Sequence, residues 1–192
     1  MLYVAYVART RPLRALALAA VFVAIFAAAL APWWRGADTF GALAHHAAPT
    51  LPHTSRSFAD LFYWLAYPLG AAAQHVAYVA VAVAGMAACA AIGVVGIARA
   101  RSPSHVIHYA LVLFLAADLV GFAWFQPWYV LWALPLALVH PDRTWLVLTA
   151  TYAALSLIAY VAPFDPVTNV AVDVYIGWLC VAHARRGAKH RV

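Results

Sequence analysis

Residues 72–98 have the sequence AAQHVAYVAVAVAGMAACAAIGVVGIA, and this stretch decides the fold class. It contains no Asp, Glu, Lys or Arg and stops just before Arg99 and Arg101. Because about 20 predominantly apolar residues are enough for a helix to cross a bilayer, we predict a transmembrane helix over these residues. Its end should lie on the side of the membrane that holds the two arginines.

The remainder of the chain has the same apolar character. Of the 192 residues, 67% are hydrophobic and 9% are charged, which leaves too little polar surface for a soluble domain of this size. Further apolar runs cover residues 15–34, 106–125, 127–139, 145–162 and 168–184. The sequence therefore predicts one all-α domain over residues 1–192, a polytopic transmembrane bundle of about six spans.

The charged residues indicate how these spans are threaded. Basic side chains gather in alternate polar gaps, namely Arg9, Arg11, Arg14, Arg99, Arg101, Arg143, Arg185, Arg186, Lys189 and Arg191. The intervening gaps hold only Arg35 and Arg56. Since loops rich in Lys and Arg stay in the cytoplasm, we predict that both termini are cytoplasmic. The net charge of +6 is then explained by topology and gives no indication of nucleic-acid binding.

The first apolar run has a second interpretation. A basic start, an apolar centre and the sequence Ala29-Leu30-Ala31 also fit a secretory signal peptide. Pro32 follows directly after the potential cleavage site and favours the transmembrane helix.

Residues 35–70 form the largest polar segment and are predicted to be an extracytoplasmic loop with a short helix. The segment is rich in Gly, Pro, His, Thr and Ser. Ser57 and Asp60 have the spacing of a capping box, which predicts a helix start there. The aromatic residues that follow predict a surface or re-entrant helix in the membrane interface: Phe62, Tyr63, Trp64 and Tyr67.

The corner between the third and fourth predicted spans, residues 125–136, has the sequence FQPWYVLWALPL. Pro127 suits the first turn of a helix, and Gln126 places an amide at the positive end of that helix's dipole. The run resembles the Pro-Trp-Tyr-Leu-Leu-Trp-x-x-Pro-Leu signature of bacterial GT-C glycosyltransferases, notably the polyprenyl-phosphate-mannose-dependent mannosyltransferases. The sequence APWWRG over residues 31–36 resembles the Pro-Phe-Trp-x-Gly that closes a helix in the same enzymes.

The resemblance implies a membrane transferase of the bacterial inner membrane. Such an enzyme moves a sugar, mannose in the resembling enzymes, from a polyprenyl-phosphate donor at the extracytoplasmic face. It implies donor-binding roles for Gln126, Trp128 and Tyr129, with Arg35 or Arg56 meeting the donor phosphate. The expected partners are thus the lipid bilayer and the lipid-linked donor. No cofactor is implied, and the loop histidines His45, His46 and His53 match no metal-ligand spacing.

The resemblance covers only the later part of such an enzyme. The catalytic acid of the class lies in an early extracytoplasmic loop, whereas Asp38 and Asp60 are the acids of the large outer loop here and lack the paired setting of the class. The sequence therefore identifies no catalytic residue, and whether the chain is itself an enzyme stays open. It is a fragment, one chain of a split enzyme completed by an N-terminal half, or a divergent protein.

Asp118 lies well inside the third predicted span. A lone carboxylate near mid-membrane costs about 2.5 to 3.5 kcal/mol, so Asp118 should face a water-filled cavity near the donor or form an interhelical hydrogen bond. The same two interpretations apply to Asp173. The alternative function is a non-enzymatic membrane protein, a small transporter or flippase-like subunit or a structural partner, in which Asp118 and Asp173 line a path.

The remaining polar and sulfur-bearing side chains are predicted to have structural roles. Cys89 and Cys180 lie in apolar runs and are expected to be small buried hydrophobic residues. The histidines of the cytoplasmic side are expected to meet lipid headgroups: His105, His108, His140, His183 and His190.

Overall fold

A computed structural model describes residues 2–34, Gly36, Asp38, 58–121, 127–161 and 166–189 of the chain, and the described part contains helices and no strand. The elements are α1 (Leu2–Ala8), α2 (Pro12–Leu30), η1 (Ala31–Trp33), α4 (Phe58–Leu65), η2 (Tyr67–Leu69), α5 (Ala71–Arg99), α6 (Pro103–Ala116), η3 (Ala117–Gly121), η4 (Pro127–Trp132), α7 (Leu134–Val139), α8 (Arg143–Val161) and α9 (Pro166–Lys189). The predicted all-α class is confirmed.

Three segments are long and apolar enough to cross a membrane: residues 12–29, 71–99 and 103–120. The longest is α5, whose 29 residues extend about 43 Å at a rise of 1.5 Å per residue. This length exceeds the hydrocarbon core of a bilayer, which is about 30 Å thick. Shorter apolar helices cover residues 129–139, 143–158 and 171–183. The three long segments indicate a membrane protein, while the number of six spans stays a prediction.

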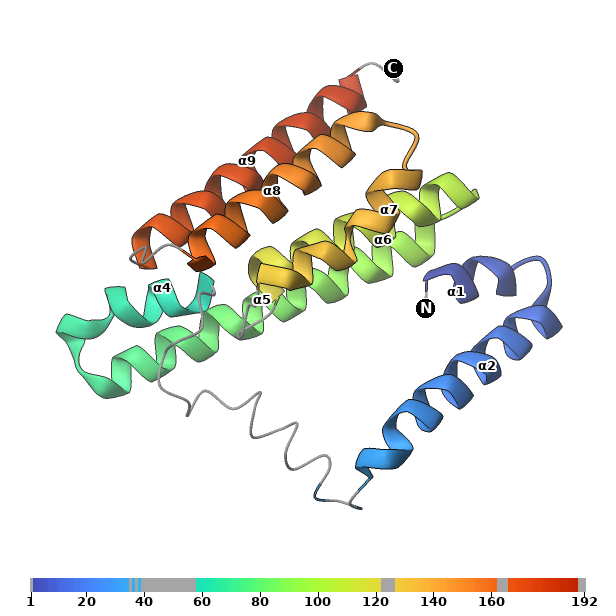
Figure 1. The fold of residues 1–192 in the computed structure, drawn as a ribbon, viewed down its shortest axis with the longest axis horizontal. Coiled ribbons are helices and arrows are strands. Elements are labelled where there is room, and N and C mark those ends of the chain that lie inside the picture. Colours follow the sequence, from blue (N-terminus) through green and yellow to red (C-terminus); the bar gives the residue numbers. More distant parts are fainter. Residues whose placement is uncertain are drawn as a thin grey trace.

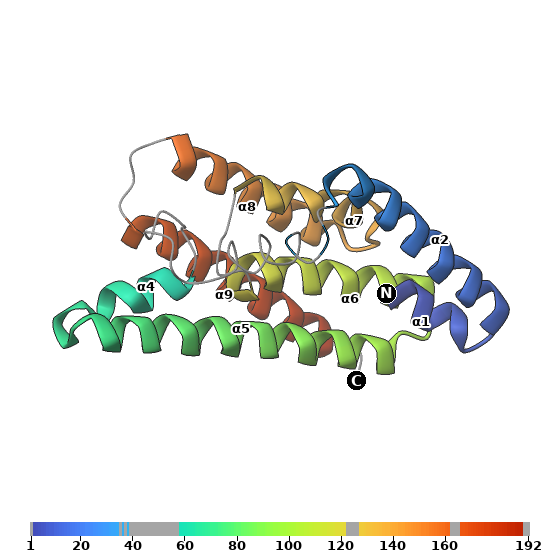
Figure 2. The ribbon, with the colours of Figure 1, turned by 90° about the horizontal axis from the view of Figure 1, so that it is seen from below.

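The helices are arranged as antiparallel pairs along one long axis (Figures 1 and 2). The α5–α6 pair and the α8–α9 pair lie beside each other, and η4 and α7 fill the space between α6 and α8. At one end α4 folds back on α5, whereas at the other end α1 packs against α5 and α6. Helix α2 packs on α1 and η1 and stands apart from the rest of the bundle in Figure 1.

The main core lies where α6, η4, α7, α8 and α9 meet. Its completely buried side chains include Leu111 from α6, Val130 from η4, Tyr152 from α8 and Ile176 from α9. Ala133 and Ala137 complete the contact with no exposed surface. Small residues at these positions let the helix backbones approach closely, which is the usual way that helices pack within a bilayer.

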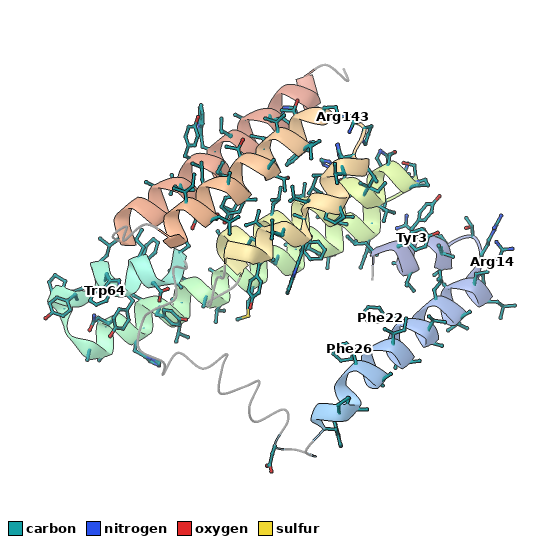
Figure 3. All side chains as sticks on the ribbon, viewed as in Figure 1. Tyr3, Arg14, Phe22, Phe26, Trp64 and Arg143 are labelled. Atoms are coloured by element: carbon teal, nitrogen blue, oxygen red, sulfur yellow. The ribbon has the colours of Figure 1, made fainter. Side chains whose placement is uncertain are left out.

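The basic segments gather at one end of the bundle. The Arg9 guanidinium donates hydrogen bonds to the carbonyl oxygens of Ala100 (3.0 Å) and Ala98 (3.2 Å), and also to that of Ile97. These carbonyls belong to the C-terminal turn of α5, where a cation is electrostatically favourable. Figure 3 shows Arg14 and Arg143 toward this end and Trp64 at the opposite end of the long axis.

The structure differs from the predicted span boundaries in α6. This helix begins at Pro103 rather than at Val106, because the Ser102 side chain caps it by accepting a hydrogen bond from the His105 backbone N–H (3.3 Å). Its end also differs, since the α-helix stops at Ala116 and continues as the π-helical turn η3. The span predicted over about 106–125 therefore starts three residues earlier and is not a regular α-helix throughout, while its predicted end at Phe125 lies outside the described residues.

The predicted helix over 127–139 is broken as well. It consists of the 3₁₀ segment η4 followed by the short helix α7, with Pro135 in the first turn of α7.

The short helix predicted after Ser57 is present as α4, although Ser57 itself lies outside the described residues. Trp64 and Tyr67 near its end are largely exposed, as expected for an interfacial segment.

Candidate functional site

The backbone is irregular between the third and the fourth predicted spans. The α6 helix changes to the π-helical turn η3, and after residues 122–126, which lie outside the described part, the chain continues as the 3₁₀ segment η4. π-Helical turns inside α-helices are frequent at functional sites. At membrane depth, irregular backbone is tolerated only where protein covers it or where it lines a water-filled cavity. This corner is therefore the candidate site.

Two of the predicted site residues can be placed in this corner. Asp118 lies in η3 with 3% of its surface exposed. Tyr129 lies in η4, half-buried, with its ring centroid 4.8 Å from that of Trp132. Trp128 belongs to η4, but its side chain is not among the described ones, and Gln126, Arg35 and Arg56 lie outside the described residues. The predicted donor contacts of these four residues stay predictions.

Asp118 belongs to a group of buried polar side chains from three elements. Tyr152 on α8 is completely buried, and Asp173 on α9 is buried as well. Tyr152 interacts electrostatically with the carboxyl groups of Asp173 and Asp118, and the two carboxyl groups interact with each other. Neither carboxylate oxygen of Asp118 has a hydrogen-bond partner. We call Asp118, Tyr152 and Asp173 the acid cluster.

The sequence places the acid cluster through helical spacing. Thr149, Tyr152 and Ser156 follow one another at intervals of three and four residues, so they share one face of α8. All three are buried, and the Thr149 hydroxyl donates to the Trp145 carbonyl (2.8 Å). Tyr152 was not singled out from the sequence, although this polar stripe on an apolar helix was a signal that could have identified it.

The acid cluster lies deep in the bundle. Tyr152 is nine residues along α8 from Arg143 at the basic end, which corresponds to about 14 Å at 1.5 Å per residue. The hydrocarbon core of a bilayer is about 30 Å thick, so a helix that starts at one interface brings this position close to mid-membrane. In the predicted six-span topology, the carboxyl groups would thus lie far from both headgroup layers.

Asp60, one of the two acids predicted for the outer loop, is part of a helix contact. It is 3% exposed on α4 and faces Tyr78 on α5, which is also buried. Gln74, one turn before Tyr78, is buried at the same end. Asp60 therefore contributes to the packing of α4 on α5 in the described structure.

The histidines at the basic end were expected to meet headgroups, and three of them have partners within the protein. His108, His140 and His183 surround the buried Trp145, with ring centroids 5.5 to 6.0 Å from the indole. His108 Nδ1 and His140 Nε2 share a hydrogen bond of 3.2 Å. The three rings thus interact with side chains inside the protein, because α6, α8 and α9 converge there.

Asp142 completes this inner group. Its backbone N–H donates to His140 Nδ1 (3.1 Å), and its carboxylate accepts from His183 Nε2 (2.6 Å). Burial alone would raise the pKa of Asp142, but the Thr144 N–H (2.9 Å) and His183 together hold the pKa below its ordinary value. Asp142 thus stays ionised and links the α7–α8 turn to α9.

No three His, Cys, Asp or Glu side chains in the described part of the chain are arranged to hold a metal ion. Cys89 and Cys180 are free thiols and half-buried, less deeply than predicted.

No protein-family model matches this chain, and neither a curated protein nor a solved structure does. The function is therefore argued from the residues and their geometry.

Proposed function

We propose that the chain is a GT-C-like membrane glycosyltransferase, or the C-terminal part of one, that binds a polyprenyl-phosphate sugar. In this proposal it crosses the bacterial inner membrane six times, about the number that its apolar runs allow, with both termini in the cytoplasm. The observation that carries the proposal is the form of the motif over residues 127–136. It folds as a 3₁₀ segment and a short helix against α6 and α8, rather than as an uninterrupted span.

An interrupted helix in a membrane offers polar backbone groups that a continuous helix would hide. The N–H groups at the start of η4 lack intrahelical acceptors, and the local dipole favours an anion such as a phosphodiester. Tyr129 and Trp132 form an aromatic pair in the same segment. Flat rings of this kind can lie against the C–H faces of a sugar. In this proposal, one segment thus binds both the phosphate and the sugar of the donor.

In the proposed reaction, the acceptor hydroxyl attacks the anomeric carbon of the donor sugar and polyprenyl phosphate leaves. A carboxylate must take the proton of that hydroxyl, and we propose that a separate N-terminal half supplies it. The chain itself would contribute the donor side, with Arg35 or Arg56 offsetting the charge on the departing phosphate. Mannose is the proposed sugar, on the strength of the sequence resemblance.

Donor binding is the direct test. The purified chain in lipid nanodiscs should bind radiolabelled polyprenyl-phosphate mannose, and Trp128→Ala or Gln126→Ala should weaken binding by about tenfold, equivalent to one lost contact of about 1.4 kcal/mol. Trp178→Ala is the matched control, because Trp178 on α9 is 61% exposed and far along the chain from the motif. Absence of donor binding by the unaltered chain, or equal effects of all three variants, would reject the proposal.

A second candidate function, a flippase-like or transport subunit, is favoured by the acid cluster. Acidic side chains near mid-membrane commonly mark ion or substrate pathways. Proteoliposomes that contain fluorescent polyprenyl phosphate and are treated with external dithionite would test it. Transport predicts that more than the outer leaflet is bleached and that Asp118→Asn abolishes the excess, whereas the transferase proposal predicts bleaching of the outer leaflet alone.

A further inference from the structure

We propose that the hydrogen bond between His108 and His140 is a pH-sensitive latch, which holds α6 to the end of α7 and opens when both imidazole rings become cationic. His108 lies on α6 and His140 directly follows α7, and the two rings meet beside the buried Trp145. The proposal goes beyond glycosyl transfer and does not depend on it.

The neighbours of His140 determine where its ring hydrogen lies in the neutral form. The Asp142 backbone N–H donates to His140 Nδ1 (3.1 Å), so this nitrogen carries no hydrogen. The hydrogen of neutral His140 therefore lies on Nε2, which donates it to His108 Nδ1 across 3.2 Å. The latch is thus closed when both rings are neutral.

The closed latch can bind one further proton. His140 Nδ1 also lies 3.2 Å from the Asp142 carbonyl oxygen, so a proton bound to this nitrogen has an acceptor. His140 can therefore become cationic while its Nε2 continues to donate to His108. A first proton thus leaves the contact between α6 and α7 intact.

A second proton breaks this contact. It must bind to His108 Nδ1, the nitrogen that accepts the hydrogen bond from His140. Two N–H groups would then point at each other, and two cations would meet where His140 is only 6% exposed. Because water screens charges poorly in such a buried place, the doubly charged closed form is strongly disfavoured. The rings must separate and reach water before both can be charged, so acid opens the latch.

The link between Asp142 and His183 responds to acid in the opposite way. His183 Nε2 on α9 donates to the Asp142 carboxylate (2.6 Å), and a proton taken up by His183 converts this hydrogen bond into an ion pair. Asp142 stays ionised in mild acid, since its pKa lies below the ordinary value. The α7–α8 turn therefore remains attached to α9 at a pH that releases α6.

The cationic and neutral groups around the latch do not compensate a second positive charge. The Arg143 guanidinium donates to the Leu138 carbonyl oxygen (3.2 Å), and the Arg9 guanidinium donates to carbonyl oxygens at the end of α5. His105, one turn before His108, makes no hydrogen bond through Nδ1. Further described titratable side chains of the adjoining elements are neutral or cationic at neutral pH: Tyr3, Tyr6, Arg99, Arg101, Tyr109, Tyr129, Tyr152 and Cys180.

The acidic groups of the adjoining elements are also accounted for. Asp118 and Asp173 lie ten residues along the chain from His108 and His183 respectively, which corresponds to about 15 Å in a helix. Among the described carboxylates, Asp142 is the one that bonds to this group of histidines, and it is engaged with His183. The second charge on the latch thus finds no carboxylate of its own.

Distances between spin labels, measured by double electron–electron resonance, test the latch in the full chain in nanodiscs. Ser104→Cys on α6 and Val139→Cys on α7 place the labels at exposed positions, and Cys89→Ala and Cys180→Ala remove the native thiols. From about pH 8 to pH 5, the range over which histidine changes charge, a second and longer distance should appear. Its population relative to the short distance should rise about tenfold per pH unit below about pH 6.5, because opening takes up one proton.

Two variants and a second pair of labels sharpen the test. His108→Gln and His140→Gln each keep a side chain that can form hydrogen bonds but cannot become cationic, so the distance should no longer depend on pH. His75→Gln is the matched control, because His75 is exposed at the opposite end of α5 and should leave the response unchanged. Labels at Val139→Cys and Val181→Cys, on α7 and α9, should keep one distance throughout.

Circular dichroism verifies that each variant is folded. A single distance at every pH in the folded chain would overturn the inference. An undiminished response in His108→Gln and His140→Gln would also overturn it, since another group would then be the switch. If α7 and α9 separate together with α6, the bundle is unfolding and there is no selective latch. No sugar donor is present, so these outcomes are independent of the proposed transferase activity.

Discussion

Asp142 shows how a single side chain can link two helices at the basic end. Its carboxylate accepts from His183 on α9 and from the Thr144 N–H at the start of α8. Because this side chain is 45% exposed, the ion pair should contribute no more than about 1 kcal/mol. We expect Asp142→Asn to lower the unfolding midpoint slightly at neutral pH.

The pH dependence of this effect has a definite sign. The pKa of Asp142 is lower in the folded protein than its ordinary value, so its stabilisation is present above the unfolded-state pKa, about 3.9. It is lost as the pH falls through the folded value. The difference in midpoint between the unaltered chain and Asp142→Asn should therefore disappear in strong acid. A difference that stays constant over the whole range would show that Asp142 acts by packing.

Removing the Tyr152 hydroxyl should lower the free energy of unfolding. Tyr152→Phe keeps the ring in the core but removes a buried hydroxyl that interacts electrostatically with the Asp173 and Asp118 carboxyl groups. We expect a loss of about 1 to 3 kcal/mol in unfolding free energy, measured in mixed micelles of denaturing and mild detergent. Tyr175→Phe on the same bundle is the control, because Tyr175 is 53% exposed and should change stability little.

At the scale of elements, Gly96 sets how closely α5 approaches its neighbours. A Cβ added there would lie 3.0 Å from both Tyr109 Cβ on α6 and Leu2 Cδ2 on α1. Since Tyr109 Cβ is fixed to the helix backbone, α5 and α6 must separate to accept the extra carbon. We expect Gly96→Ala to destabilise the chain by about 1 to 3 kcal/mol, the usual cost of overpacking.

Gly93 provides a matched comparison for Gly96, because it lies one turn earlier on α5 and a Cβ there would meet nothing within 4 Å. Gly93→Ala should be neutral or slightly stabilising, since alanine favours helix more than glycine does. Unfolding midpoints measured in the same detergent mixture compare the two. If Gly93→Ala is as harmful as Gly96→Ala, the close contact of α5 with Tyr109 is not the cause.

The elements also show what the sequence could and could not predict. Helix α5 was predicted at 72–98 and found at Ala71–Arg99, because its long apolar run has clear polar limits. The π-helical turn at Asp118 and the 3₁₀ segment at Pro127 were not predicted, since such irregularities depend on contacts between helices. Asp118 was identified because a lone acid stands out in an apolar run. Tyr152 was missed because a tyrosine does not.

At the scale of the whole molecule, α2 exposes apolar side chains on every side. Leu13, Leu16 and Ile25 are at least 65% exposed, and α2 contacts chiefly α1 and η1. In water such a surface would be strongly unfavourable, whereas lipid tails cover it at no such cost. The predicted bundle class therefore fits the structure best if α2 lies in the bilayer. The sequence alone could not show that α2 would stand apart, because its apolar residues follow no single face.

The proposed transferase site depends on the orientation of the bundle, with the basic ends in the cytoplasm and the Pro127–Trp132 corner on the opposite side. Reporters that are active in only one compartment, fused after Gln126 and at the C-terminus, test it most directly. We predict that the fusion after Gln126 reports the extracytoplasmic side and that the C-terminal fusion reports the cytoplasm. If both fusions report the same side, the corner cannot meet a donor at the outer face and the proposed transferase site is contradicted.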